Sequence, residues 1–377
     1  MAVTLVTNAS ATFGSDEPKV SVKRAVDGVV APLMEKDGIP GMAVGIAFAG
    51  ETYEFEFGVA SKSPARPVTR KTLFEVGSIS KTFTATLASW AQVTGKLSLA
   101  DDTATYLPSL RGTDFGKVTL LELGTHTPGG MPLQVPDGVN NDEQLLSYLA
   151  QWHPAYAPGT MRTYNNPGIG TLGLITAKSS GQRFDTLMER QLFPMLGLKN
   201  TFINVPSGKM ADYAEGYRDD GTPIRMAPGE LWAEAYGVRT TVSDLLRFLQ
   251  ANMGEIPLEP SLQRAIAQTH TGYFQAGPMT QDLIWEQYPY PVALATLRKG
   301  NSPEMILTAT PVSRLKPPLP PRADVWINKT GSTNGFGAYV AFVPSKRVGI
   351  VILANRNYSI KDRVTAAYEI ADALTAP

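Results

Sequence analysis

Ser78 and Lys81 lie three residues apart in the stretch Ser78-Ile79-Ser80-Lys81, which opens a segment with helical periodicity. In a helix this spacing puts the hydroxyl and the amine on one face, about one turn apart. A serine at a helix start also lies near unpaired backbone N–H groups and the positive end of the helix dipole. An amine held beside it in a partly buried cleft can have a lowered pKa and accept the serine proton. The pattern predicts a nucleophilic serine. The simpler alternative is that Ser78 or Ser80 caps the helix beside a solvated lysine.

Tyr164 and Asn166 form a second motif, in the loop that follows Pro158-Gly159. A tyrosine close to two ammonium groups would favour its phenolate form and could move a proton. The asparagine offers both a donor and an acceptor to an amide substrate. Taken alone, this motif is more typical of an aromatic residue on a turn.

Lys329-Thr330-Gly331 is the third motif, and it follows a strand-like segment. A cation and a hydroxyl at the end of an edge strand can hold a substrate carboxylate, and a glycine lets a ligand approach the backbone closely. A plain strand-to-turn transition explains the motif equally well in isolation. The three motifs in this order, each on a suitable element, are a much stronger signal than any one of them.

Together the three motifs resemble the signature elements of class C β-lactamases, and the resemblance runs from about residue 20 to the C-terminus. It includes the segments Phe74 to Ser78, Leu133 to Asp137, Ala233 to Gly237, Gly335 to Val340 and Leu353 to Tyr358. The resemblance implies a periplasmic enzyme without metal or cofactor, whose partner is a small-molecule β-lactam. We also expect a monomer. The site would lie in the cleft between an α/β domain and a helical domain.

Residue by residue, the resemblance implies that Ser78 is the nucleophile and that Lys81 and Tyr164 handle its proton. Tyr164 would then help to activate the deacylating water. Lys329 would set the local electric field and, with Thr330, meet the substrate carboxylate. The backbone N–H groups of Ser78 and Ser332 would form an oxyanion hole. The residues expected to bind the substrate are Gln134, Asn166, Tyr236, Thr330, Gly331, Ser332, Asn357 and Arg363, with Gln134 and Asn166 contacting its acylamido side chain.

The sequence departs from the usual family pattern at Trp232 and Ile360. Trp232 stands where the family commonly has a small acidic residue, and Ile360 where many members have an asparagine that touches the substrate carboxylate, although Arg363 remains one turn into the helix. An indole on the rim of the site would offer the acylamido group a flat apolar surface and favour compact or aromatic groups over branched oxyimino groups. An indole under the loop would only anchor it. Both departures concern substrate preference rather than reaction type.

The segments around the motifs predict an α/β chain in which one antiparallel sheet is built from both chain ends and is flanked by terminal helices. Helical periodicity covers Lys19 to Lys36 and about Asp362 to Leu374. Strands are predicted at Met42 to Phe48, Tyr53 to Phe57, Asp324 to Asn328, Ala338 to Val343 and Val348 to Leu353.

The middle of the chain is predicted to be mostly helical, with a proline-rich extended loop at Thr308 to Arg322. The expected helices are Lys81 to Leu97, Asp142 to Trp152, Gly173 to Gly181, Phe184 to Leu192 and Thr241 to Met253. We therefore expect an α/β domain of residues 18–77 and 205–377, and a mostly helical domain of residues 78–204. Residues 1–17 are expected to be a leader or a disordered segment.

The composition fits a globular enzyme and excludes several other classes. Of the 377 residues, 43% are hydrophobic and 18% charged, and the 34 basic residues balance the 34 acidic ones. With no net charge and no block of like charges, neither nucleic acid nor an anionic membrane is an expected partner. No apolar run approaches the roughly 18 residues of a membrane helix. The absence of cysteine excludes disulfides, thiolate zinc sites and a cysteine nucleophile.

Other catalytic motifs are absent or lack the context that they require. His126, His153 and His270 are far apart in sequence and include no H-E-x-x-H motif, so a zinc hydrolase is not expected. The segment Gly168 to Gly173 matches G-x-G-x-x-G, but the residues before it cannot form the buried strand of a dinucleotide site. No G-x-S-x-G motif is present, which argues against an α/β-hydrolase.

The predicted function is a β-lactamase that prefers cephalosporins and forms a serine acyl-enzyme. A carboxylesterase or a D-Ala-D-Ala peptidase with the same serine, lysine and tyrosine is the closest alternative. Esterases of this type usually carry a tryptophan-containing motif in place of Lys329-Thr330-Gly331, so this motif favours β-lactams. A peptidase would react with penicillin and deacylate very slowly. A penicillin-sensing binding module is less favoured, because the sequence contains no transmembrane segment or signalling domain.

Overall fold

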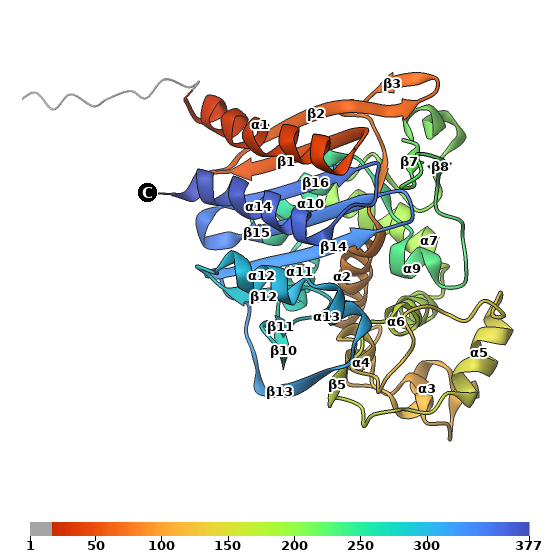
Figure 1. The fold of residues 1–377 in the computed structure, drawn as a ribbon. Coiled ribbons are helices and arrows are strands. Elements are labelled where there is room, and N and C mark those ends of the chain that lie inside the picture. The colour runs from red at the N-terminus through yellow and green to blue at the C-terminus, as the bar shows by residue number, and fades with distance from the viewer. Residues whose placement is uncertain (1–16, 377) are drawn as a thin grey trace, which may run out of the picture.

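One antiparallel sheet of eleven strands joins the two ends of the chain in this computed structural model, which describes residues 17–376 (Figure 1). The expected leader therefore lies outside the described residues, apart from Glu17 at the start of the first helix. In spatial order the strands are β3 (Ala65–Pro67), β2 (Glu51–Lys62), β1 (Gly41–Phe48), β16 (Val348–Ala354), β15 (Gly337–Val343), β14 (Val325–Ser332), β12 (Glu286–Pro289), β11 (Met279–Gln281), β10 (Gly272–Ala276), β13 (Thr310–Leu319) and β5 (Met161–Arg162).

The central strands are buried on both faces, as β16 illustrates. Val351 and Leu353 of this strand belong to one hydrophobic cluster, while Ile350 and Ile352 belong to another, because successive side chains of a strand point to opposite faces. The first cluster includes α10 (Val242–Met253). The second includes α1 (Glu17–Asp37) and α14 (Ile360–Thr375), which pack against each other over the sheet (Figure 1).

Helices α6 (Asn166–Ser179), α9 (Trp232–Tyr236) and α11 (Pro260–Thr269) pack against α2 (Ser80–Val93), which is buried on almost every side. Phe83 and Leu87 of α2 belong to the first of these clusters, called here the cluster below the sheet because it lies on the face opposite α1 and α14. Ala85 and Ala88 belong to a third cluster, which lies among the helices. The threonine hydroxyls of α2 donate hydrogen bonds to nearby backbone carbonyls; Thr84, for example, donates to the Glu234 carbonyl at 2.6 Å. The other helices are α3 (Thr103–Tyr106), α4 (Leu120–Gly124), α5 (Asp142–Gln151), α7 (Phe184–Leu187), α8 (Phe193–Leu196), α12 (Leu294–Gly300) and α13 (Pro303–Leu307).

Two small sheets complete the fold, and the first of them fixes the turn before α2. The first consists of β4 (Phe74–Glu75), β9 (Arg239–Thr240) and β6 (Thr201–Phe202), and the second of β7 (Gly216–Tyr217) and β8 (Pro223–Ile224). Because β4 ends two residues before Gly77, its pairing with β9 holds the start of the motif segment in place.

The predicted fold class is confirmed, since the early strands β1 and β2 pair with the late strands through β16. The prediction of a loop at Thr308 to Arg322 was wrong, because β13 pairs there with β10 and β5. Strands normally avoid proline, whose nitrogen cannot donate to a neighbour. Pro317 and Pro318 are tolerated because they lie where the β10–β13 register shifts.

The helix predicted from Gly173 instead begins at Asn166. The Asn165 side chain accepts a hydrogen bond from Gly168 N at 2.7 Å and Pro167 occupies the first turn, which together form a strong helix start. Three glycines in the following residues concealed the helical pattern. Gly170 and Gly173 pack against Leu231 and Glu234, so the G-x-G-x-x-G segment serves helix packing.

Arg162 ties the edge strand β5 to the rest of the sheet. Its guanidinium is almost fully buried and donates to Gln281 Oε1 (2.7 Å), to the Met305 carbonyl (2.6 Å) and to Glu286 Oε1 (3.1 Å). The other carboxylate oxygen of Glu286 accepts from Asn328 Nδ2 at 3.2 Å. This network therefore links β5, β12 and β14.

We expect Arg162→Met to lower the free energy of unfolding by about 3–5 kcal/mol, because it leaves the Glu286 carboxylate buried without its cation. Adding Glu286→Gln should recover part of the loss by removing that unpaired charge. Urea unfolding of both variants beside the unmodified protein would measure the two effects. A single variant within about 1 kcal/mol of the unmodified protein would contradict this account.

Candidate active site

Ser78 lies in a short 3₁₀ turn, Gly77–Ile79, directly before α2. No side chain caps the start of this turn or of α2, and Ser80 Oγ instead accepts a hydrogen bond from Val238 N at 2.9 Å. The capping alternative is therefore excluded for both serines. The Ser78 hydroxyl is partly exposed and lies 2.8 Å from Lys81 Nζ.

The Lys81 amine is fully buried and also donates to the Ala235 carbonyl at 2.9 Å. Burial, and secondarily the charge of Lys329, lower the pKa of Lys81 to about 8, although Tyr164 acts in the opposite direction. The lysine is therefore close to losing its proton near neutral pH and is not a solvated surface residue.

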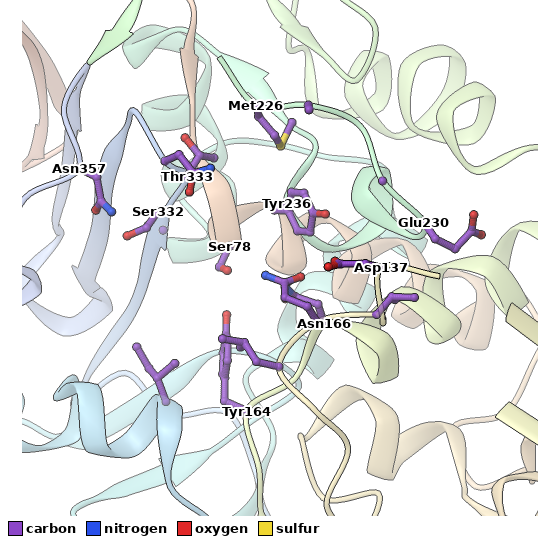
Figure 2. Close-up of a pocket in the computed structure, with 18 of the residues that line it drawn as sticks. Ser78, Asp137, Tyr164, Asn166, Met226, Glu230, Tyr236, Ser332, Thr333 and Asn357 are labelled. Carbon is purple, nitrogen blue, oxygen red and sulfur yellow. The ribbon is translucent and has the colours of Figure 1, made fainter. Parts of the chain in front are cut away.

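Tyr164 lies between two ammonium groups, with Lys81 Nζ 5.2 Å and Lys329 Nζ 5.1 Å from its ring centroid. Figure 2 shows its hydroxyl pointing toward Ser78. Burial alone would raise the pKa of Tyr164, but the charges of Lys329 and Lys81 and hydrogen bonds from Ser78 and Lys81 outweigh burial and lower it to about 8. The serine therefore has an amine and a phenol beside it, and the pKa of each is lowered to about 8.

The end of β14 approaches the turn before Ser78 so closely that two glycines are required. A Cβ on Gly331 would lie 1.9 Å from the Val76 carbonyl oxygen, and a Cβ on Gly77 would lie 2.4–2.6 Å from backbone atoms of Ser332. Gly77 also has a φ of +50°, which favours glycine. This contact holds Ser332 beside Ser78.

Ser78 opens onto a pocket of about 570 Å³ (Figure 2). All the residues predicted for the site line it except Lys81, Lys329 and Arg363, which are buried behind its walls. The predicted residues that line it are Ser78, Gln134, Tyr164, Asn166, Tyr236, Thr330, Gly331, Ser332 and Asn357.

Arg363 supports the wall of the pocket from behind. Its guanidinium donates to the Gly331 carbonyl and to Ser332 Oγ, both at 2.8 Å, and to Asn357 Oδ1 at 2.6 Å. The prediction that Arg363 contacts substrate therefore does not match this conformation, in which the side chain is fully buried. Arg363 is still linked to the pocket through its hydrogen bonds to Ser332 and Asn357, which line it. Ile360 lines the pocket directly.

Trp232 lies under its loop as an anchor and not on the rim of the pocket. It packs against the hydrophobic cluster below the sheet, the guanidinium carbon of Arg239 lies 5.0 Å from its ring, and it does not line the pocket. Two residues just before it, Gly229 and Glu230, line the pocket, and Glu230 supplies the side chain there. The expectation that Trp232 shapes substrate preference directly has no support in this geometry.

The sequence reasoning missed Arg162, His126 and Glu230 as neighbours of the site. The guanidinium carbon of Arg162 lies 5.5 Å from the Tyr164 ring centroid, and two-residue alternation from β5 could have predicted that contact. The His126 ring centroid lies 4.4 Å from that of Tyr164. Burial and the surrounding cations hold the pKa of His126 well below its usual value, so the ring is neutral. Among residues 17–376, no group of three acidic, histidine or cysteine side chains could hold a metal ion.

Comparisons with known proteins agree with this geometry. The β-lactamase family model matches residues 26–375. A β-lactamase from Lysobacter lactamgenus is 53% identical over 343 residues, which are 91% of this chain and 89% of the relative. The solved structure of a D-alanine carboxypeptidase from Burkholderia cenocepacia has 59% identity and a TM-score of 0.90, covering 96% of this chain and all of its own. That of a class C β-lactamase in complex with cefoxitin has 51% identity and a TM-score of 0.92, covering 94% and 99%.

The chain therefore belongs to the β-lactamase family, and its resemblance to class C β-lactamases is confirmed. Within the described residues, no helix is both long and apolar enough to cross a membrane.

We expect Gly331→Ala to slow hydrolysis of a chromogenic β-lactam roughly 100-fold, the scale associated with a misplacement of about 1 Å. The added Cβ would push β14 away from Val76 and move Ser332 relative to Ser78. Initial rates of hydrolysis would measure the effect, with circular dichroism to verify the fold. Gly208→Ala, where a Cβ meets nothing within 4 Å, is the matched control. Equal rates in the two variants would show that the close approach is not needed.

Proposed function

We propose that this chain hydrolyses β-lactams through an acyl-enzyme on Ser78. The observation that carries the proposal is the 2.8 Å contact between Ser78 Oγ and the buried Lys81 amine, beside Tyr164 and at the wall of a pocket. A hydroxyl is a weak nucleophile until a neighbouring base takes its proton, and this arrangement supplies one. The family membership adds support from relatives named β-lactamase.

In the proposed acylation, Ser78 Oγ attacks the lactam carbonyl as its proton passes to Lys81 or Tyr164. The backbone N–H groups of Ser78 and Ser332 would stabilise the developing oxyanion, since Gly77 and Gly331 allow the two backbones to approach. The carbonyl–nitrogen bond of the ring then breaks, and the ring nitrogen receives the proton. The product of this step is an ester on Ser78.

In the proposed deacylation, Tyr164 takes a proton from water as the water attacks the ester carbonyl. The Ser78 oxygen leaves and regains a proton from the same pair of bases. The charges of Lys81 and Lys329 on Tyr164 make phenolate accessible near neutral pH, which suits a general base.

The two ends of the pocket suggest how the substrate is oriented. Thr330 and Ser332, backed by Lys329 and Arg363, would receive the substrate carboxylate. Gln134 and Asn166 are linked by a 2.8 Å hydrogen bond and would meet the acylamido group. We also retain the family-based proposals of a periplasmic, monomeric, cofactor-free enzyme that contributes to antibiotic resistance and prefers cephalosporins.

A D-alanine carboxypeptidase is the second candidate function, because a solved structure at 59% identity carries that name. Such an enzyme would show an acylation burst and then almost no turnover of a chromogenic cephalosporin, whereas a β-lactamase would continue at a steady rate. A time course with excess substrate separates the two.

We expect Ser78→Ala to abolish turnover and to leave no covalent adduct when the protein is mixed with a β-lactam. In the unmodified protein, mass spectrometry should find the adduct on the peptide that contains Ser78. Loss of the hydroxyl should leave the fold intact, because Ser78 caps no helix. An adduct on another residue, or continued hydrolysis by the variant, would refute the assignment.

Tyr164→Phe should lower the steady-state rate by about 10²–10⁴-fold, the usual cost of losing one proton-transfer group. The phenylalanine ring keeps the contacts with His126 and with the two lysines, so the change removes little except the hydroxyl. Steady-state kinetics would measure it. A variant within a few-fold of the unmodified enzyme would show that Lys81 or water does this work.

Acylation should depend on pH with an inflection near 8, where Lys81 and Tyr164 lose a proton. A base works only when unprotonated, so kcat/KM should be high above this pH and fall below it. Because the charge of Lys329 lowers the pKa of Tyr164, Lys329→Ala should move the inflection upward. A profile that is flat between about pH 6 and pH 9 would contradict this assignment of the bases.

A further inference from the structure

Charge is distributed unevenly along the pocket. Figure 2 shows Ser332 and Asn357 on one side of Ser78, and Asn166, Asp137 and Glu230 on the other. The first side is backed by the buried cations Lys329 and Arg363. Among the described residues that line the pocket, Asp137 and Glu230 are the only charged side chains.

The carboxylates on the second side have no cation of their own. No ion pair among residues 17–376 includes Asp137 or Glu230, nor does any include Asp142 or Glu234 close by. Burial and then the charge of Asp142 raise the pKa of Glu230, so another acid is its main charged neighbour. This end of the pocket therefore carries acidic side chains that have no ion-pair partner among residues 17–376.

Asn166 provides a second, independent observation. Its side chain is only 5% exposed, and its Nδ2 is already occupied by Gln134, while Oδ1 has no hydrogen-bond partner among the described residues. A buried acceptor without a partner costs free energy until a donor reaches it. Asn166 lines the same pocket, so a ligand with a hydrogen-bond donor at this end, such as an N–H group, would complete the site.

We propose that the end of the pocket formed by Asp137, Glu230 and Asn166 selects β-lactams whose acylamido side chain carries an ammonium group. The inference rests on the proposed function and names the substrate class within it. The preferred substrates are zwitterions, with the carboxylate at the end backed by Lys329 and Arg363 and the ammonium near the two acids. An anionic side chain would meet uncompensated carboxylates and be disfavoured.

Three penicillins test this selectivity because they share one phenylacetyl skeleton. Ampicillin carries an ammonium group on the side-chain α-carbon, benzylpenicillin carries hydrogen and carbenicillin carries a carboxylate. The expected order of kcat/KM in the unmodified enzyme is ampicillin, benzylpenicillin, carbenicillin, since kcat/KM reports the steps through acylation. The decisive quantity is the ratio of ampicillin to carbenicillin.

Glu230→Gln and Asp137→Asn keep the shape of each side chain and remove its charge. Each should lower the ampicillin-to-carbenicillin ratio by about two- to fivefold, the range for a partly solvated charge pair, and the double variant by about the product. Glu143→Gln, an exposed acid on α5 that does not line the pocket, is the matched control and should leave the ratio unchanged. Thermal melting verifies that each variant is folded.

Raising the salt concentration of the unmodified enzyme is a second measurement that needs no variant. Screening of the carboxylates should bring the kcat/KM values for ampicillin and carbenicillin closer together. An ampicillin-to-carbenicillin ratio that neither salt nor the double variant changes would overturn the inference. Hydrolysis of benzylpenicillin in the same experiment would leave the proposed function standing. Failure of all three penicillins to acylate Ser78 would instead overturn the proposed function itself.

Discussion

The contact between the end of β14 and the turn before Ser78 is the constraint on which the site depends. Gly331 against Val76 and Gly77 against Ser332 bring two backbones closer than any side chain would allow. Lys329 and Thr330 are carried on the same strand, so their positions relative to Ser78 follow from this contact. The buried Arg363 side chain then fixes the strand from behind, because it donates hydrogen bonds to the Gly331 carbonyl and to Ser332 Oγ.

Buried positive charge is the second organising feature of the site. Lys81, Lys329 and Arg162 surround one phenol, and Glu286 is a carboxylate partner only for Arg162. Buried cations are unfavourable without a counter-charge, so the arrangement favours negative charge on Tyr164 and on a substrate carboxylate. Burial, and then repulsion from the same three cations, holds the pKa of His126 well below its usual value. Two of these unfavourable buried cations, Lys329 and Lys81, also lower the pKa of Tyr164.

The sequence could predict what is determined locally. The Ser78–Lys81 spacing is set by one helical turn, and strand-like runs in β1, β15 and β16, with alternation in β2, identified the strands at both ends. Features that depend on distant residues were harder to predict. β13 exists because β10 offers a partner and a register shift that tolerates Pro317 and Pro318. Trp232 turns inward because the cluster below the sheet and Arg239 receive its ring, which leaves Glu230 to face the pocket. Neither outcome is encoded in the residues adjacent to those positions.

The pairing of β1 with β16 has a consequence for how the chain must fold. A ribosome releases β1 and β2 long before β16 exists, so an emerging chain has an apolar strand with one unpaired edge for most of its synthesis. Contacts between such distant segments form slowly, since a long loop must close before they contribute. Premature termination between Lys81 and β14 would yield a protein with Ser78 and Lys81 but without the strand that completes their site. Such fragments would be inactive and prone to self-association, which makes the final strands the point at which synthesis either succeeds or produces aggregates.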